Sequence, residues 1–129
     1  MVDGTQLDER GSSPVEFVLV GALLTFLTLG VMQLGLAVYV RNVAHDAAVE
    51  GAYHAALADT TDAEGVERAR EIVARTVGAE FVQSATVHAA DPGYPAVAVT
   101  LTVTLPIVGL AGIQGGWEVT GHAPVEAFD

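Results

Sequence analysis

Glu16 is an acidic residue at the start of a long apolar segment. It lies five positions after Gly11, in the run Gly-Ser-Ser-Pro-Val-Glu-Phe that leads directly into the segment. An ionised side chain inside a membrane span costs about 2.5–3.5 kcal/mol on insertion scales, so such a residue is usually retained for a function. Two roles are open to this carboxylate. It could pair with a cation, or it could reach toward the lipid headgroups as the polar end of a helix.

The apolar segment predicts a membrane anchor. Residues 17–40 contain no charged side chain over 24 positions, and about 20 apolar residues suffice to span a bilayer. A cleavable secretory signal would have a basic start and an apolar run of roughly 7–15 residues. Here the start is acidic and the run is longer, so we predict a retained transmembrane helix over residues 12–40. Arg10 and Arg41 flank its two ends, and charge alone does not orient it.

Small residues recur within the membrane segment. Gly21, Thr28 and Gly35 are spaced seven residues apart. Small side chains allow membrane helices to approach closely, so these positions could form a packing seam against sister helices. The alternative is the ordinary frequency of small residues in membrane spans.

Beyond residue 40 the sequence predicts that the helix continues. Small apolar residues recur at helical spacing over residues 41–58, so one helix over residues 15–58 is expected. A face of alanine and glycine buries little area per residue but permits close approach of a neighbouring element. The members of this face are Ala44, Ala47, Ala48, Gly51, Ala55 and Ala58.

A second helix is predicted over residues 62–77. Thr61 and Glu64 have the spacing of a capping box, in which each side chain accepts a hydrogen bond from the other residue's backbone N–H. Gly78 is a predicted C-terminal cap. The predicted apolar face consists of Val66, Ala69, Ile72, Val73 and Val77.

The rest of the chain predicts about three antiparallel strands. Residues 81–90 are β-prone, and Asp-Pro-Gly at 91–93 indicates a turn. Residues 96–105 and 117–128 alternate between apolar and small or polar side chains, as half-buried strands do. Pro124 favours an edge position for the last strand.

These elements together predict a small α+β head domain over residues 41–129. The glycine-rich apolar stretch at residues 106–116 joins its last two strands. It could be an exposed contact with another subunit or with the membrane surface, or a connection that folds back onto the core.

Composition excludes several kinds of function. The chain has five Arg, no Lys and 16 acidic residues, and its formal net charge is −11. Residues 1–16 carry −3 and residues 41–129 carry −8, so no basic patch is available for nucleic acid. The absence of cysteine excludes disulfides and thiolate chemistry.

No catalytic motif, metal site or cofactor site emerges from the sequence. A His-Glu-x-x-His pattern, a phosphate-binding loop and a Gly-x-Ser-x-Gly motif are all missing. We therefore expect a protein that is not an enzyme. The histidines are interpreted as surface or turn residues, although two of them could meet across strands. They are His45, His54, His88 and His122, the last two being the possible pair.

The N-terminal pattern resembles the TadE-like family of pilin-related proteins of the tight-adherence (Tad/Flp) pilus system. The family's start, Arg-Gly followed by small residues and then Val-Glu-Phe, is similar to residues 10–17. A second family motif, Ala-Arg-Glu-Gly-Ala-Arg, is similar to residues 48–53. Glu50 and Gly51 keep that motif, and Val49 and Tyr53 replace its two arginines. The resemblance covers residues 10–58.

This resemblance implies a pilin-like fold and a minor pilin or pseudopilin that acts in pilus biogenesis, adhesion and secretion. It implies that a prepilin peptidase removes the leader, residues 1–11, at the cytoplasmic face and leaves Ser12 as the new N-terminus. The head would then lie outside the cytoplasm. Glu16, followed by Phe17, would be the counter-ion for the free amine of a neighbouring subunit. The implied partners are the bilayer, other pilin-like subunits and the assembly machinery.

A second hypothesis comes from a different functional class. The chain could be a single-pass membrane-anchored binding module whose extracytoplasmic head captures a ligand and never assembles. Leader removal discriminates between the two, because only an assembling pilin needs a free amine close to Glu16.

Overall fold

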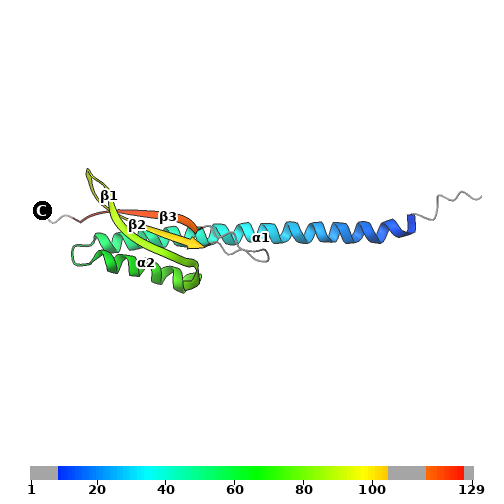
Figure 1. The fold of residues 1–129 in the computed structure, drawn as a ribbon, viewed down its shortest axis with the longest axis horizontal. Helices are drawn as coiled ribbons and strands as arrows, with labels where there is room; N and C mark the ends of the chain where they lie inside the picture. Colours follow the sequence, from blue (N-terminus) through cyan, green and yellow to red (C-terminus); the bar gives the residue numbers. More distant parts are fainter. Residues whose placement is uncertain (1–8, 105–115, 127–129) are drawn as a thin grey trace, which may run out of the picture. The chain divides into compact units, whose positions relative to one another are not determined.

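The computed structural model describes residues 9–104 and 116–126, which form two helices, a short 3-10 helix and a three-stranded sheet (Figure 1). This arrangement confirms the predicted α+β class. The chain comprises two compact units, residues 1–35 and residues 36–129. In chain order the elements are α1 (Glu9–Ala56), α2 (Asp62–Thr76), η2 (Ala79–Phe81), β1 (Val82–Asp91), β2 (Tyr94–Thr104) and β3 (Gly116–Pro124).

Helix α1 is long and apolar enough in its N-terminal part to cross a membrane. It is continuous over 48 residues and starts at Glu9, six residues before the predicted start. In the first unit, the side chains of residues 11–35 are exposed, except for the half-buried Gln33. The hydroxyls of Thr25 and Thr28 donate to the backbone carbonyls of Gly21 and Leu24, each at 2.8 Å. These polar groups are therefore satisfied within the helix, as an apolar solvent requires.

The second unit is organised around the alanine face of α1. Among the described residues, Val40 is the first in the chain that is fully buried, with 1% of its surface exposed. The predicted face is confirmed except at Ala58, which is exposed because the helix ends at Ala56. Ala52 and Ala56 are buried as well. The main core cluster is Ala47, Ala48, Ala52, Ala56, Ala69, Val73, Val99, Leu101 and Ala123.

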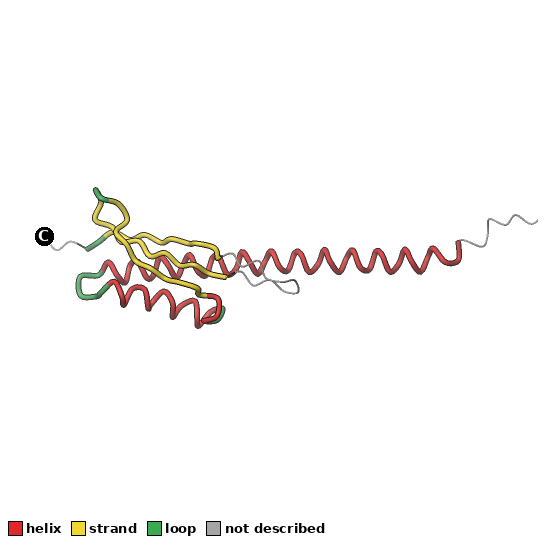
Figure 2. Tube along the Cα trace, viewed as in Figure 1, coloured by secondary structure: helices red, strands yellow, loops and turns green. Residues whose placement is uncertain are grey.

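Helix α2 lies beside the C-terminal part of α1 on one face of the sheet (Figure 2). The buried residues of α2 are Gly65, Ala69 and Val73. Val66, which was predicted to belong to the buried face, is only half-buried, and Gly65 occupies the contact instead. The physical reason is space, because a side chain at position 65 would enter the backbone of α1.

The contact between the helices is made by two glycines. A Cβ built on Gly65 would lie 2.6 Å from the carbonyl oxygen of Gly51 and would also collide with the methyl group of Ala55. A Cβ on Gly51 would lie 2.7 Å from the carbonyl oxygen of Gly65 and 2.8 Å from the Cβ of Ala69. The two backbones thus meet without intervening side chains.

The N-terminal cap of α2 is confirmed, whereas at the other end the helix stops at Thr76 with Val77 as its cap and the predicted cap, Gly78, follows. At the N-terminus, the backbone N–H of Thr61 donates to Glu64 Oε2 at 2.7 Å, and the N–H of Glu64 donates to Thr61 Oγ1 at 3.3 Å. This is the complete capping box. At the C-terminus, Gly78 has φ = 126° and donates its N–H to the carbonyl of Val73 at 3.2 Å. Residues with side chains rarely adopt that conformation, so glycine is required there.

The three strands form an antiparallel sheet in the order β1-β2-β3. The inner residues of the central strand, Val99, Leu101 and Val103, are fully buried as predicted, but Ala98 and Thr100 on the other face are buried too, so the expected half-buried pattern is wrong there. β3 is an edge strand, as Pro124 predicted. Leu105 and residues 106–115 of the glycine-rich stretch lie outside the described residues.

Strand β3 also contacts the backbone of α1 through a glycine. Gly121 is buried, and a Cβ at this position would lie 2.6 Å from the Cα of Val49 and would collide with the carbonyl carbon of Ala48. Gly121 pairs with Val99 in the neighbouring strand, so this close approach sits next to the centre of the core.

We predict that Gly65→Ala destabilises the head. The added methyl group overpacks the contact with α1, and overpacking typically costs about 1–3 kcal/mol. The better helix propensity of alanine offsets up to about 1 kcal/mol of this. Urea unfolding of the full chain in detergent should therefore show a lower free energy of unfolding. Gly93→Ala is the control, because a Cβ at Gly93 meets nothing within 4 Å. Equal stability of the two variants would contradict the close contact.

We also predict that the capping box makes the head acid-sensitive. The backbone N–H of Thr61, then its hydroxyl, and the nearby His54 hold the pKa of Glu64 below its ordinary value of 4.5. A lowered pKa in the folded state means that the stabilisation is present above the unfolded pKa and is lost as pH falls through the folded pKa. Stability should therefore decline as the pH drops below about 4.5.

Glu64→Gln tests this acid sensitivity, because a glutamine can still accept the cap hydrogen bond but does not titrate. Its free energy of unfolding should fall less steeply with acid than that of the wild type, as measured by urea unfolding between pH 5 and pH 3. Parallel curves would show that other carboxylates cause the decline.

Candidate functional site

Glu16 and Phe17 lie on α1 and are exposed, Phe17 with 80% of its surface. Glu16 forms no ion pair with any side chain in the described part of the chain. A single chain thus leaves the carboxylate available to a cation from elsewhere, at the start of the membrane segment. The counter-ion role itself stays a prediction.

The predicted cleavage point, between Gly11 and Ser12, lies inside α1, and both residues are exposed. Pro14 is also inside this helix. Proline cannot donate the hydrogen bond that would reach four residues back, and its ring crowds that carbonyl group. The affected carbonyl belongs to Arg10, on the leader side of the predicted cleavage point. The helix is therefore locally weakened where the peptidase would have to act.

The predicted packing seam is open in the single chain. A Cβ at Gly21 or Gly35 would meet nothing within 4 Å, whereas a Cβ at Gly51, Gly65 or Gly121 in the head would collide with a neighbouring element. The hydroxyl of Thr28 is bonded within its own helix. Among the described residues no other element packs on Gly21 or Gly35, and packing against a sister helix stays a prediction.

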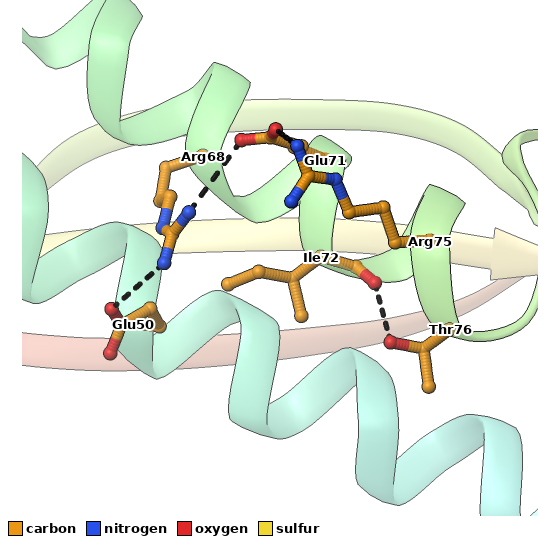
Figure 3. Close-up of polar contacts among 6 residues, drawn as sticks. All are labelled: Glu50, Arg68, Glu71, Ile72, Arg75 and Thr76. Carbon is orange, nitrogen blue, oxygen red and sulfur yellow. Dashed lines mark hydrogen bonds and ion pairs between the residues drawn. The ribbon is translucent and has the colours of Figure 1, made fainter.

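Glu50 links the two helices of the head. Its Oε1 lies 3.7 Å from one guanidinium nitrogen of Arg68, whose other terminal nitrogen lies 3.6 Å from Glu71 Oε2, and Glu71 pairs in turn with Arg75 (Figure 3). These side chains are 39–75% exposed. Exposed ion pairs contribute between 0 and about 1 kcal/mol each, so Glu50 is a minor contributor to stability.

Gly51, the second residue of the family motif, has a different role. It supplies the backbone carbonyl against which Gly65 packs. Helical spacing predicts Gly51 on the apolar face but does not identify Gly65 as its partner. A signal was present in two matching patterns of small residues four apart, Gly51 with Ala55 and Gly65 with Ala69, which interlock in the structure.

The histidines do not form a metal centre. His88 and His122 lie on the outer face of the sheet, each opposite Ala98 in the central strand, so a whole strand separates them. Among the described residues, no group of three or more His, Asp or Glu side chains is placed to hold a metal ion. An open groove of about 460 Å³ runs between α1 and α2. It is lined by Glu50, His54, Glu64, Glu67, Arg68 and Glu71.

One contact near the start of the head was missed by sequence reasoning. The guanidinium carbon of Arg41 lies 5.5 Å from the ring centroid of Trp117. Cation–π pairs of this kind contribute about 0.5–1 kcal/mol at exposed sites. The two residues are 76 positions apart, and they meet because β3 places Trp117 beside Val103, which shares a core cluster with Val40 of α1.

Comparison with known proteins finds a match to most of helix α1. Residues 11–52 match the family model of TadE-like proteins. This match confirms the resemblance drawn from residues 10–17 and 48–53, and it supports a role associated with the Tad pilus. Comparisons with curated proteins and with solved structures gave no match. The TadE-like match includes Gly11, Glu16 and Gly51, whereas the sheet lies outside it.

Proposed function

We propose that this chain is a TadE-like minor pilin or pseudopilin, a structural assembly component of a Tad/Flp type IV pilus or of a related secretion apparatus, and not an enzyme. The observation that carries this proposal is the match over residues 11–52. The matched region begins at the glycine that would end the leader and contains the carboxylate of Glu16. It also includes the glycine at the helix crossing of the head.

The geometry of Pro14 supports processing between Gly11 and Ser12. In the full-length helix, Pro14 conflicts with the carbonyl of Arg10, and a proline inside a helix costs about 3 kcal/mol. After cleavage Pro14 is the third residue of the chain and lies in the first helical turn. Backbone N–H groups there have no intrahelical partner, so proline is tolerated. Removal of the leader thus turns an internal defect into an acceptable helix start.

The same cleavage would create a positively charged partner for the carboxylate of Glu16. The new amine on Ser12 is a cation near the membrane surface, and the side chain of Glu16 is exposed and unpaired with any described side chain. Attraction between opposite charges is much stronger near the low-dielectric bilayer than in water. Pairing of Glu16 with the Ser12 amine of a neighbouring subunit would favour incorporation and set the axial register between subunits.

Orientation follows from the same proposal. Prepilin peptidases of this pilus system act at the cytoplasmic face, so the leader would start inside the cell. The head would lie outside the cytoplasm, anchored by one membrane helix and able to contact other pilin-like subunits and the assembly machinery. Adhesion would be a property of the assembled structure.

We predict that the protein purified from its own host lacks residues 1–11, as measured by intact mass. Gly11→Leu should block cleavage and leave the full-length precursor in the membrane. Gly21→Leu is the matched control, since a Cβ at Gly21 also meets nothing within 4 Å, and it should be processed normally. Retention of the leader by the wild type beside an active prepilin peptidase would favour the non-assembling binding module.

We further predict that Glu16→Ala and Glu16→Gln insert and are processed normally but fail to co-purify with partner subunits and fail to restore surface pili. Glutamine preserves shape and hydrogen bonding, so its failure would identify the charge as the cause. Glu50→Gln, a carboxylate in the same matched region but in an exposed ion pair, is the control and should assemble. Normal association of both Glu16 variants would refute the counter-ion role.

A further inference from the structure

We propose that Trp117, Arg41 and Tyr39 form a docking surface that seats the head directly on the lipid headgroups of the bilayer. The occupant is the interfacial layer of a phospholipid membrane. The inference rests on the membrane anchorage in the proposed function, and the experiment below separates failure of one from failure of the other.

The first step is the position of Arg41 relative to the bilayer. Residues 17–40 are uncharged, and 24 helical residues rise about 36 Å, against about 30 Å for the hydrocarbon core. Tyr39 and Arg41 therefore fall in the headgroup layer. Val40, between them, is buried, with only 1% of its surface exposed, and belongs to a core cluster with Ala44, Val103 and Val119 of the head. The folded head thus begins where the apolar segment ends, with no linker between them.

The second step is the position of Trp117. It pairs with Val103 in the neighbouring strand, and Val103 packs against Val40. The cation–π contact places the indole beside Arg41. Trp117 therefore lies level with the last residues of the apolar segment and keeps 41% of its surface exposed.

The third step is the chemistry of these side chains. Tryptophan and tyrosine are enriched at membrane interfaces because each ring has an apolar body and a polar edge. Guanidinium groups bind phosphate through paired hydrogen bonds and stack on aromatic rings. Tyr39 and Arg41 are about 200° apart around the helix, so interfacial side chains stand on both of its sides. A head with a charge of −8 is repelled by anionic lipid, so neutral phospholipids are the fitting surface.

The experiment uses the fact that Trp117 is the only tryptophan in the chain. The full chain is reconstituted into phosphatidylcholine vesicles whose acyl chains carry bromine near the headgroup or near the bilayer centre. Bromine quenches indole fluorescence on contact, so emission reports the depth of one side chain. Trp117 should be quenched strongly by the shallow bromines and weakly by the deep ones.

Two variants in a Trp117→Phe background calibrate depth. Leu29→Trp, in the middle of the apolar segment, should be quenched mainly by the deep bromines. Tyr94→Trp should not be quenched, because Tyr94 lies nine residues of β2 beyond Val103, about 30 Å away, at the other end of the sheet. Trp117 emission indistinguishable from that of Tyr94→Trp would overturn the docking surface. So would a shielded Trp117 that no bromine quenches, which would indicate contact with another subunit.

The role of Arg41 is tested by charge reversal. Arg41→Glu should reduce the quenching of Trp117 by shallow bromines, because it removes the phosphate-binding group beside the indole. Arg75→Glu makes the same change in charge on the exposed end of α2 and should leave the quenching unchanged. Equal effects would refute a specific role of Arg41. Flotation of each sample with its vesicles checks anchorage: protein that does not float overturns both proposals, whereas floating protein with unquenched Trp117 overturns only this one.

Discussion

The packing of the head depends on close contact between the backbones of its helices and its sheet. Helix α1 meets α2 at Gly51 and Gly65 and meets β3 at Gly121, and in each case a single methyl group would collide with the partner. Dispersion forces decay steeply with distance, so a core of alanine and glycine is cohesive only if its elements approach this closely. The described core of the head consists mainly of alanine and valine, whose side chains are too small to fill wider gaps. Among its described residues, the largest fully buried side chains are Leu101, Val40, Val73, Val99 and Val103.

This constraint explains how one helix can be exposed to lipid in its N-terminal part and packed against protein in its C-terminal part. Residues 11–35 expose apolar side chains, as a lipid environment requires, whereas the face beyond Val40 consists of small residues that fit against protein. Lipid chains adapt to large side chains, but a packed sheet and a second helix need a smooth surface. The change in side-chain size along α1 therefore marks the change from anchor to head. Arg41 and Trp117 are paired at this transition.

The proposed assembly role draws on the parts of the chain that a single subunit leaves unused. Glu16 has no ion-pair partner among the described residues, and the glycines of the membrane segment have open space around them. Pro14 fits better in a helix that begins at Ser12 than in one that begins at Glu9. In the head, by contrast, Gly51, Gly65 and Gly121 and the capping groups of α2 make their contacts within the chain. This division is the one expected of a subunit whose anchor makes contacts between chains and whose head folds by itself.

The sequence by itself determined the features that depend on near neighbours. The apolar segment, the capping box of Thr61 and Glu64, the existence of the strand β2 and the edge position of Pro124 all follow from local spacing, and the structure confirms them. The family match over residues 11–52 likewise depends on one contiguous stretch of sequence. Gly11 and Glu16 were identified in this way, although their roles await experiment.

Only the tertiary structure decided which distant residues meet. In the structure Gly65, and not Val66, makes the contact between the helices. Ala58 is exposed, and Arg41 lies beside Trp117. The structure also shows that a whole strand separates His88 from His122. Periodicity marks which face of an element is apolar, but it carries no information on the crossing point of two helices or on strand register. Those depend on where two backbones can come closest, and that is a property of both surfaces together.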